Sequence, residues 1–125
     1  MAVSNLKNNI SIIEQGTETV GTITWTYRKW SDGTVECWTA TSAKSKTIST
    51  SYGAGFYGAR DAYSFPSGLF ISISEVQASL RDTNAIGTWF SLQAVSTTEM
   101  GGYIFSLTAN TITVQLYIHA IGRWK

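Results

Sequence analysis

Hydrophobic and polar residues alternate with a period of two along much of the chain, most clearly in the segment 111–125. Such a strand covers a core with one face and meets solvent or a partner with the other. The core face is expected to carry Ile112, Val114, Leu116, Ile118 and Ala120, and the opposite face Thr113, Gln115, Tyr117 and His119.

Other segments alternate in the same way, and none sustains the 3.6-residue repeat of a helix. Residues 68–80 change phase partway, which predicts a β-bulge near Ser74 and Glu75 or, alternatively, a strand buried on both faces. The residues expected to share a face are Ile23, Trp25 and Tyr27; Ile86, Phe90, Leu92 and Ala94; Tyr103, Phe105 and Leu107; and, around the phase change, Leu69, Ile71 and Ile73 followed by Val76, Ala78 and Leu80.

Turn-forming residues separate these segments at short intervals. We therefore predict an all-β fold of about seven strands, an antiparallel β-sandwich of jelly-roll-like type. Residues 1–13 are polar and weakly patterned and are expected to form an arm or linker remnant, with residues 14–125 as the sandwich domain. The turn signals are Asp32-Gly33, the glycine-rich residues 53–58, Pro66-Ser67-Gly68, Asp82-Thr83-Asn84, Gly101-Gly102 and Asn110.

The stretch WTYRKWSDGTVECW, residues 25–38, predicts a β-hairpin with a two-residue type I′ turn at Asp32-Gly33. That loop would pair Lys29 with Glu36 and Tyr27 with Trp38. A three-residue loop through Ser31 is the alternative; it would shift every pairing by one and break this charge pair.

The side chains of this hairpin divide into expected core residues and one expected surface residue. Trp25, Tyr27 and Trp38 are expected in the core, because large aromatic side chains dominate small cores. Cys37 is expected to be a small buried hydrophobic side chain, because no base is placed beside it. Trp30, at the tip, is the ring that is free to touch a ligand.

Charge and cysteine content exclude several classes of protein. The net charge is +1 and the nine cationic residues are scattered, so no basic patch predicts nucleic-acid binding. A single cysteine allows neither an intramolecular disulfide nor a cysteine-based metal site. The first residues lack the pattern of a signal peptide, and no apolar run is long enough to span a bilayer. We expect synthesis in a cytoplasm and no membrane insertion.

No arrangement of residues predicts catalysis. His119 is the only histidine and is expected to have a structural or interface role. The eight acidic residues show no spacing that singles out a catalytic pair. Motifs for phosphate, calcium or zinc binding are absent from the sequence. We therefore predict a protein that is not an enzyme and has no cofactor, metal or catalytic residues.

The segment SYGAGFYGARDAYSFPSG, residues 51–68, sets aromatic rings among glycines with Arg60-Asp61 between them. Rigid rings beside adaptable polar groups are typical of loop-based binding surfaces and suit sugar recognition. The alternative is that these rings anchor a long loop onto the sandwich. The candidate ligand-binding residues are Trp30, Asp32, Tyr52, Tyr57, Arg60 and Asp61.

Residues 14–38 and the terminal IHAIGRWK, residues 118–125, resemble the opening and closing motifs of C-terminal domains of tail-fibre or baseplate proteins. These are the receptor-binding or minor structural proteins of tailed bacteriophages and prophages of Gram-positive bacteria. The motifs cover roughly a third of the chain; residues 40–110 match only in their general β character. About 13 residues precede the domain, so the chain is expected to be an excised tip or a short stand-alone protein.

The resemblance implies a β-sandwich tip domain that works in the virion, at the phage tail tip, as a homotrimer attached to other tail or baseplate proteins. It implies weak, multivalent binding of a host cell-surface glycan. The alternatives are a structural cap that trimerises the fibre without a ligand, and a small carbohydrate-active enzyme. Two surfaces are candidate subunit interfaces: a threonine face of Thr24, Thr26, Thr39 and Thr41, and the face of the last strand that carries Tyr117, His119 and Ile121.

Overall fold

The computed structural model describes residues 10–82 and 87–125. It is all-β and antiparallel, with 73% of these residues in strands and no helix among them. The predicted fold class is thus confirmed, with ten strands in place of about seven. The strands are β1 (Ile12–Val20), β2 (Ile23–Trp30), β3 (Thr34–Ala40), β4 (Lys44–Tyr52), β5 (Gly55–Gly58), β6 (Asp61–Ser64), β7 (Ser72–Asp82), β8 (Thr88–Val95), β9 (Glu99–Ser106) and β10 (Asn110–Arg123).

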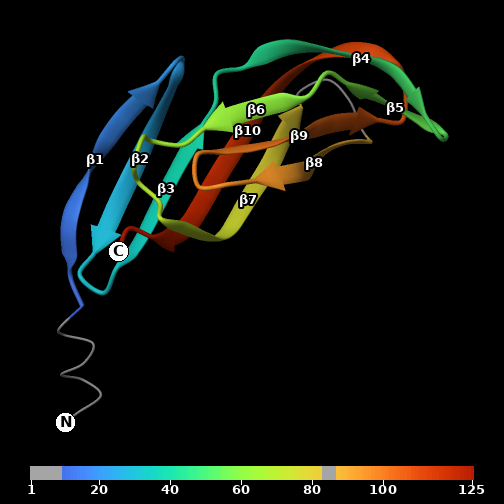
Figure 1. Cartoon of the computed structure of the whole chain (residues 1–125). Coiled ribbons are helices and arrows are strands. Elements are labelled where there is room, and N and C mark those ends of the chain that lie inside the picture. Colours follow the sequence, from blue (N-terminus) through green and yellow to red (C-terminus); the bar gives the residue numbers. More distant parts are fainter. Residues whose placement is uncertain (1–9, 83–86) are drawn as a thin grey trace.

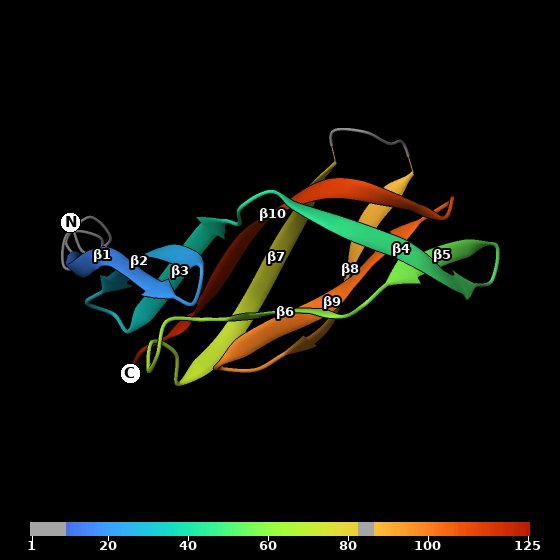
Figure 2. The ribbon, with the colours of Figure 1, turned by 90° about the horizontal axis from the view of Figure 1, so that it is seen from above.

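The strands form two layers that are joined at one end (Figures 1 and 2). One layer consists of β1, β2, β3, β10 and β7, in this order of pairing, and the other consists of β6, β9 and β8. Strands β4 and β5 pair with β10 and β9, respectively, and so carry the hydrogen bonding from one layer to the other. The result is a sandwich-like arrangement in which β10 and β9 are the central strands.

The core lies between the two layers. The alternation of β10 is confirmed: its five predicted apolar side chains are all buried, and the side chains between them are exposed or half-buried. Three of them, Leu116, Ile118 and Ala120, belong to a first cluster with Trp25, Val35 and Cys37 from the same layer and Tyr63 and Met100 from the other. A second cluster, Ile48, Ile104, Ile112 and Val114, fills the end where β4 crosses between the layers.

The phase change in residues 68–80 is a β-bulge in β7, as predicted. Glu75 pairs with Ile121 and Ile73 pairs with Gly122, so Ser74 is the extra residue. The bulge lets side chains on both sides of it face the core: Ile73 before it, and Val76, Ala78 and Leu80 after it, all pack against the first cluster.

The hairpin between β2 and β3 has a three-residue loop, so the predicted two-residue register is wrong. Arg28 pairs with Glu36 and Lys29 with Val35. The type I′ turn would need a positive φ at Asp32, and among the described residues only glycines have one; Gly33 has a φ of 96°. The Asp32 side chain instead accepts a hydrogen bond from the Thr34 backbone N–H at 2.9 Å. This capped turn followed by a left-handed glycine is the usual three-residue loop.

The shifted register changes which hairpin side chains reach the core. Trp25 and Cys37 are fully buried, as predicted, and Tyr27 is half-buried against the core. The prediction for Trp38 is wrong: Trp38 is half-buried on the outer face of the layer, beside His119. Arg28 lies over the Trp38 ring at 5.1 Å and comes within 3.9 Å of Glu36, so Arg28 replaces Lys29 as the partner of that carboxylate.

The predicted threonine face does not exist as one surface. Thr39 and Thr41 are buried, and their hydroxyls bond to the backbone of Thr24 and Leu116. Thr24 instead pairs with Thr19 of β1, with 2.9 Å between their hydroxyl oxygens. The interface prediction for this face is therefore wrong, because the register places its members on opposite sides of the layer.

The predicted domain boundary at residue 14 falls within strand β1, which begins at Ile12. Ile12 already pairs with Trp30. Residues 1–9 of the predicted arm lie outside the described residues. No helix within residues 10–82 and 87–125 has the length and apolar character to cross a membrane.

Candidate functional site

The six candidate binding residues do not form one site. Trp30 and Asp32 lie at the end of the β2–β3 hairpin, whereas Tyr52 and Tyr57 lie at the other end of the molecule, around the β4–β5 turn (Figure 1). Arg60 and Asp61 follow β5 directly but point in different directions, as described below. The structure thus separates the hairpin tip from the aromatic residues.

The hairpin tip is held by the last residues of the chain. The Trp124 indole N–H donates to the Trp30 carbonyl at 2.9 Å, and the Trp124 backbone N–H donates to the Gly33 carbonyl at 2.9 Å. The Arg123 side chain donates to the Asp32 carbonyl at 2.7 Å. We call these five residues the hairpin corner. It joins the two sequence motifs: residues 14–38 span β1 to β3, and residues 118–125 include the end of β10, which pairs with β3.

Asp61 points into the protein and is 6% exposed. Its carboxylate forms ion pairs with the ammonium groups of Lys44 and Lys46, the second at 3.1 Å. These ion pairs connect β4 to β6 and compensate for the burial of the charged carboxylate. This placement favours a structural role for Asp61 over contact with a ligand.

Five aromatic side chains gather on the outer face of β5, β9 and β8 and at the end of β4. Tyr57 is the central ring, with centroids 6.2 Å from Tyr52, 5.7 Å from Tyr103 and 5.9 Å from Phe105. Trp89 stacks on Phe105 with 5.6 Å between centroids and 8° between planes. We call this group, Tyr52, Tyr57, Trp89, Tyr103 and Phe105, the aromatic face.

The alternation of β9 explains why these rings point outward. Met100 and Ile104 are fully buried, so Tyr103 and Phe105 occupy the opposite phase, away from the core. The predicted face of Tyr103, Phe105 and Leu107 exists, but it is the outer face, and Leu107 is 59% exposed. Trp89 and Tyr52 are 45% and 68% exposed. Exposed rings of this size make this face a candidate binding surface.

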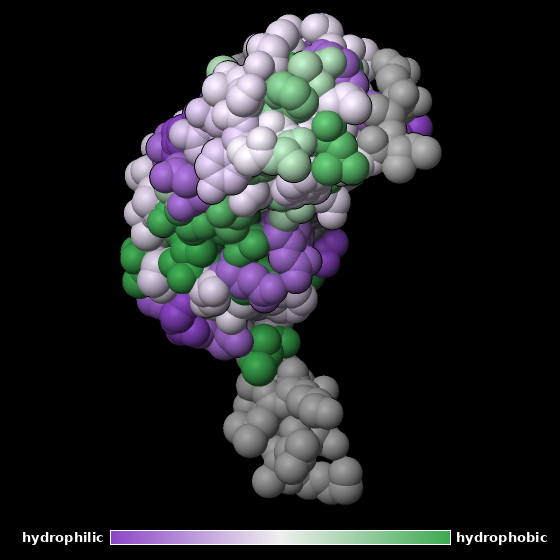
Figure 3. Space-filling model, turned by 90° about the vertical axis from the view of Figure 1, so that its right-hand side faces the viewer, coloured by the Kyte–Doolittle hydropathy of each residue, from purple (hydrophilic) through white to green (hydrophobic). Residues whose placement is uncertain are grey.

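Two shallow hollows lie on the aromatic face. One, of about 240 Å³, is lined by Tyr52, Tyr57, Tyr103 and Phe105. The other, of about 420 Å³, lies between Tyr52, Trp89 and Leu107. Figure 3 views the side of the molecule that is on the right in Figure 1, where hydrophobic and hydrophilic residues are mixed. Open hollows with aromatic walls suit a ligand with flat apolar faces and a polar rim.

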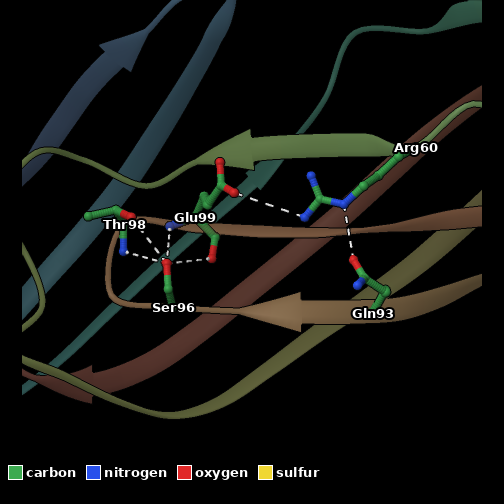
Figure 4. A network of polar contacts seen from close by, with 5 residues as sticks. All are labelled: Arg60, Gln93, Ser96, Thr98 and Glu99. Atoms are coloured by element: carbon green, nitrogen blue, oxygen red, sulfur yellow. Dashed lines mark hydrogen bonds and ion pairs between the residues drawn. The ribbon is translucent and has the colours of Figure 1, made fainter.

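Arg60 lies beside the aromatic face and belongs to a network of polar side chains (Figure 4). Its Nε donates to Gln93 Oε1 at 3.0 Å, and its Nη2 is 3.9 Å from Glu99 Oε1. Gln93 is the extra residue of a β-bulge in β8, which is why it turns toward Arg60. At the other end of this network Ser96 caps the β8–β9 turn by accepting from the N–H groups of Thr98 and Glu99.

The guanidinium of Arg60 lies on Gly101. A Cβ at this glycine would be 2.2 Å from Nη2 and 2.6 Å from Cζ of Arg60. Gly101-Gly102 was predicted to form a turn, and that prediction is wrong: both glycines lie within β9. At Gly102, on the inner face, a Cβ would be 2.1 Å from the Ser91 carbonyl oxygen. The two glycines therefore allow close approach of neighbouring groups on the two faces of one strand.

Two further polar side chains of the described residues, Cys37 and His119, were considered for chemistry in the sequence. Burial raises the pKa of the Cys37 thiol to about 12, and the adjacent Glu36 carboxylate adds to the shift, so this thiol is unreactive near neutral pH. His119 Nε2 is 3.0 Å from Glu36 Oε2, on the outer face of β3 and β10. No group of three or more potential metal ligands occurs in the described part of the chain.

Sequence reasoning identified Tyr52, Tyr57 and Arg60 but missed Trp89, Tyr103 and Phe105 as members of the same surface. The sequence contains one indication of this surface: Tyr103, Ile104 and Phe105 are consecutive, so alternate positions on both faces of the strand are apolar. Such a strand has two hydrophobic faces, and only the packing of the layers determines which one is covered.

Comparison with solved structures finds a shared fold. Two fibre structures are similar: a P. aeruginosa R1 pyocin fibre comprising C-terminal residues 323–701, and an N-truncated R1-type pyocin tail fibre. Each match has a TM-score of 0.59 and 13% sequence identity and covers 97% of this chain. The match covers 30% of the first fibre chain and 93% of the second. No protein-family model matches the chain, and no curated protein matches its sequence.

Proposed function

We propose that this chain is a tail-fibre or baseplate domain of a phage or phage-tail-like particle, and that its aromatic face binds a saccharide on the host cell surface. The observation that carries this proposal is the cluster of five rings on the outer face, of which Tyr52 and Trp89 are exposed and the other three half-buried. A sugar ring has a face of C–H groups that stacks on aromatic rings and an edge of hydroxyls that bond to polar side chains. The aromatic face supplies the rings, and Gln93 and Arg60 supply polar groups beside them.

The place of the domain in a tail fibre is supported by two independent likenesses. The sequence motifs at residues 14–38 and 118–125 resemble tail-fibre and baseplate proteins, and the fold is similar to that of pyocin fibres at 13% identity. We propose other tail or baseplate proteins as partners and the virion tail tip as the location. A Gram-positive host remains a prediction from the sequence motifs alone.

We propose further that the domain is a homotrimer that associates through the outer face of β3, β10 and β7. Trp38, Tyr117 and His119 line a hollow of about 380 Å³ there, and Tyr117 is 43% exposed. This face belongs to the layer opposite the aromatic face. Subunits joined through it would present three aromatic faces outward, and three weak sites bind a repetitive surface more tightly than one.

The saccharide proposal is tested with an array of surface glycans and with whole cells. We expect wild type to bind a subset of glycans and Tyr57→Ala to lose that binding, because this ring contacts three others. Trp30→Ala is the matched control, since Trp30 lies at the hairpin corner. A folded protein that binds no glycan and no cell would contradict the proposal. It would favour the alternative, a structural cap that only closes the fibre. Release of sugar fragments would instead indicate a carbohydrate-active enzyme.

The trimer is tested separately, by the mass of the protein in solution. We expect three copies for wild type and a single copy for Tyr117→Asp, because a charge placed in an apolar contact must be desolvated. A stable wild-type monomer across the micromolar range would contradict the trimer and leave the saccharide proposal to the array.

A further inference from the structure

The polar groups beside the aromatic face point to the chemical class of its ligand. Resting on the proposed saccharide site, we infer that Arg60 is an anion subsite and that the aromatic face takes an acidic saccharide, one that carries a carboxylate or a phosphate. Three observations support the inference: the Arg60 guanidinium lies on Gly101, its hydrogen bond to Gln93 orients it, and its distance from the aromatic rings suits one ligand.

The guanidinium is held in one place by two contacts. Gly101 lets it lie against the strand, and Gln93 Oε1 accepts from its Nε at 3.0 Å, so the terminal nitrogens are directed away from Gln93. Within residues 10–82 and 87–125, the carboxylate nearest to these nitrogens is Glu99, at 3.9 Å and itself half-exposed. That distance is at the limit of an ion pair, so Arg60 retains donors for a ligand anion.

The two lysines Lys44 and Lys46 share one buried carboxylate, that of Asp61. Arg60 is the cation that lies on Gly101, on the face of β9 that also carries Tyr103 and Phe105. A fork of N–H donors matches the geometry of a carboxylate or phosphate, and neutral sugars have no group that uses its charge.

The spacing between Arg60 and the rings fits one saccharide that touches both. Gly101 and Tyr103 are two residues apart on the outer face of β9, which places the guanidinium about 7 Å along the strand from the first ring. Phe105, stacked on Trp89, is about 13 Å along the strand from Gly101. A short oligosaccharide spans this distance, with a sugar ring stacked on the aromatic side chains and an acidic substituent at Arg60.

The test compares acidic saccharides with matched neutral ones on the same protein. The probes are oligogalacturonates with their methyl esters, and phosphorylated oligomannose with its dephosphorylated form, first on an array and then by calorimetric titration. We expect the acidic member of a pair to bind about tenfold more tightly than the neutral one at low salt. This preference should shrink as salt rises, because exposed charges are screened. The pair that shows it distinguishes a carboxylate from a phosphate ligand.

Three substitutions connect this preference to Arg60. Arg60→Gln should lower affinity for the acidic member about tenfold and leave the neutral member unchanged. Gly101→Ala should do the same, since its Cβ displaces the guanidinium without touching the rings. Glu99→Gln should raise affinity for the acidic member about threefold, because it removes a competing carboxylate.

The outcomes separate this inference from the proposed function. Neutral binding that equals or exceeds acidic binding in every pair would overturn the anion subsite and leave the saccharide site standing. An acidic preference that survives both Arg60→Gln and Gly101→Ala would overturn the assignment to Arg60. Absence of binding to all array glycans and to cells would overturn both proposals.

Discussion

The hairpin corner and the aromatic face both hold an arginine against a glycine, and the two arrangements have opposite consequences. At the corner, Arg123 lies on Gly33 and donates to the backbone carbonyls of Asp32 and Lys125. At the aromatic face, Arg60 lies on Gly101 and donates to one side-chain amide. The first arginine connects the chain end to the hairpin through backbone carbonyls, whereas the polar contacts of the second are with side chains.

The tryptophans of the two regions differ in the same way. Trp124 donates its indole N–H to the Trp30 carbonyl, and Lys29 lies 5.5 Å from its ring. Trp89 contacts only another ring, Phe105, among the aromatic and polar contacts of the described residues, and is 45% exposed. Aromatic content by itself therefore does not identify a binding surface; the partners of the polar atoms do.

The largest difference is expected when each glycine is replaced by alanine. Gly33→Ala should destabilise the protein by about 2–3 kcal/mol, because its φ of 96° strains any other residue and its Cβ would lie 2.3 Å from Arg123. Gly101 has no positive φ, so Gly101→Ala should change the free energy of unfolding by less than about 0.5 kcal/mol. Urea denaturation measures the free energy of unfolding of both variants. Equal losses would show that the two arginine–glycine contacts are alike.

A smaller difference is expected between the two tryptophans. Trp124→Phe removes the indole donor and leaves the Trp30 carbonyl without its partner, which should cost about 1–2 kcal/mol. Trp89→Phe keeps a ring against Phe105 and should cost less than about 0.5 kcal/mol. The melting temperature of each variant checks this, and a larger loss for Trp89→Phe would reverse the roles assigned to the two regions.

The two arginines should differ by a similar but smaller amount. Arg123→Gln loses a donor to the Asp32 carbonyl and should cost about 1 kcal/mol. Arg60→Gln removes exposed contacts and should leave stability within about 0.5 kcal/mol of wild type. The comparison fails if Arg60→Gln is the more destabilised variant in the same denaturation series.

The smallest effect concerns acid pH at the corner. The hydrogen bond from the Thr34 N–H lowers the pKa of Asp32, so its stabilising contribution is present above the unfolded pKa of about 4 and is lost as pH falls through the lower folded value. Asp32→Asn keeps an acceptor but does not titrate. The difference in free energy of unfolding between wild type and this variant should be constant from pH 7 to 5 and should disappear below pH 4. A difference that widens in acid would contradict the assignment.

Periodicity predicted much of the fold because strands such as β10 have one strongly apolar face. It placed the core side chains of β10 and the bulge at Ser74 correctly. It failed where one residue decides the outcome: the Asp32 side chain selects a three-residue loop, which shifts the hairpin register and moves Trp38 to the surface. A strand period carries no information on loop length.

The candidate site was predicted only in part, for a related reason. Tyr52, Tyr57 and Arg60 were found because they are close in sequence. Trp89 and Phe105 come from other strands, and they meet Tyr57 because β9 pairs with both β5 and β8. Gly101, a turn signal in sequence, lies within β9 and contacts the Arg60 side chain from the β5–β6 connection. Such contacts are set by tertiary packing alone.

The most direct test of the contrast between the two regions is the indole N–H spectrum of the five tryptophans, recorded by NMR with and without the best-binding glycan. Each signal is assigned from its Trp→Phe variant. We predict that the Trp89 signal shifts on binding while those of Trp30 and Trp124 stay in place. A shift at Trp30 and Trp124 with an unchanged Trp89 would contradict the account.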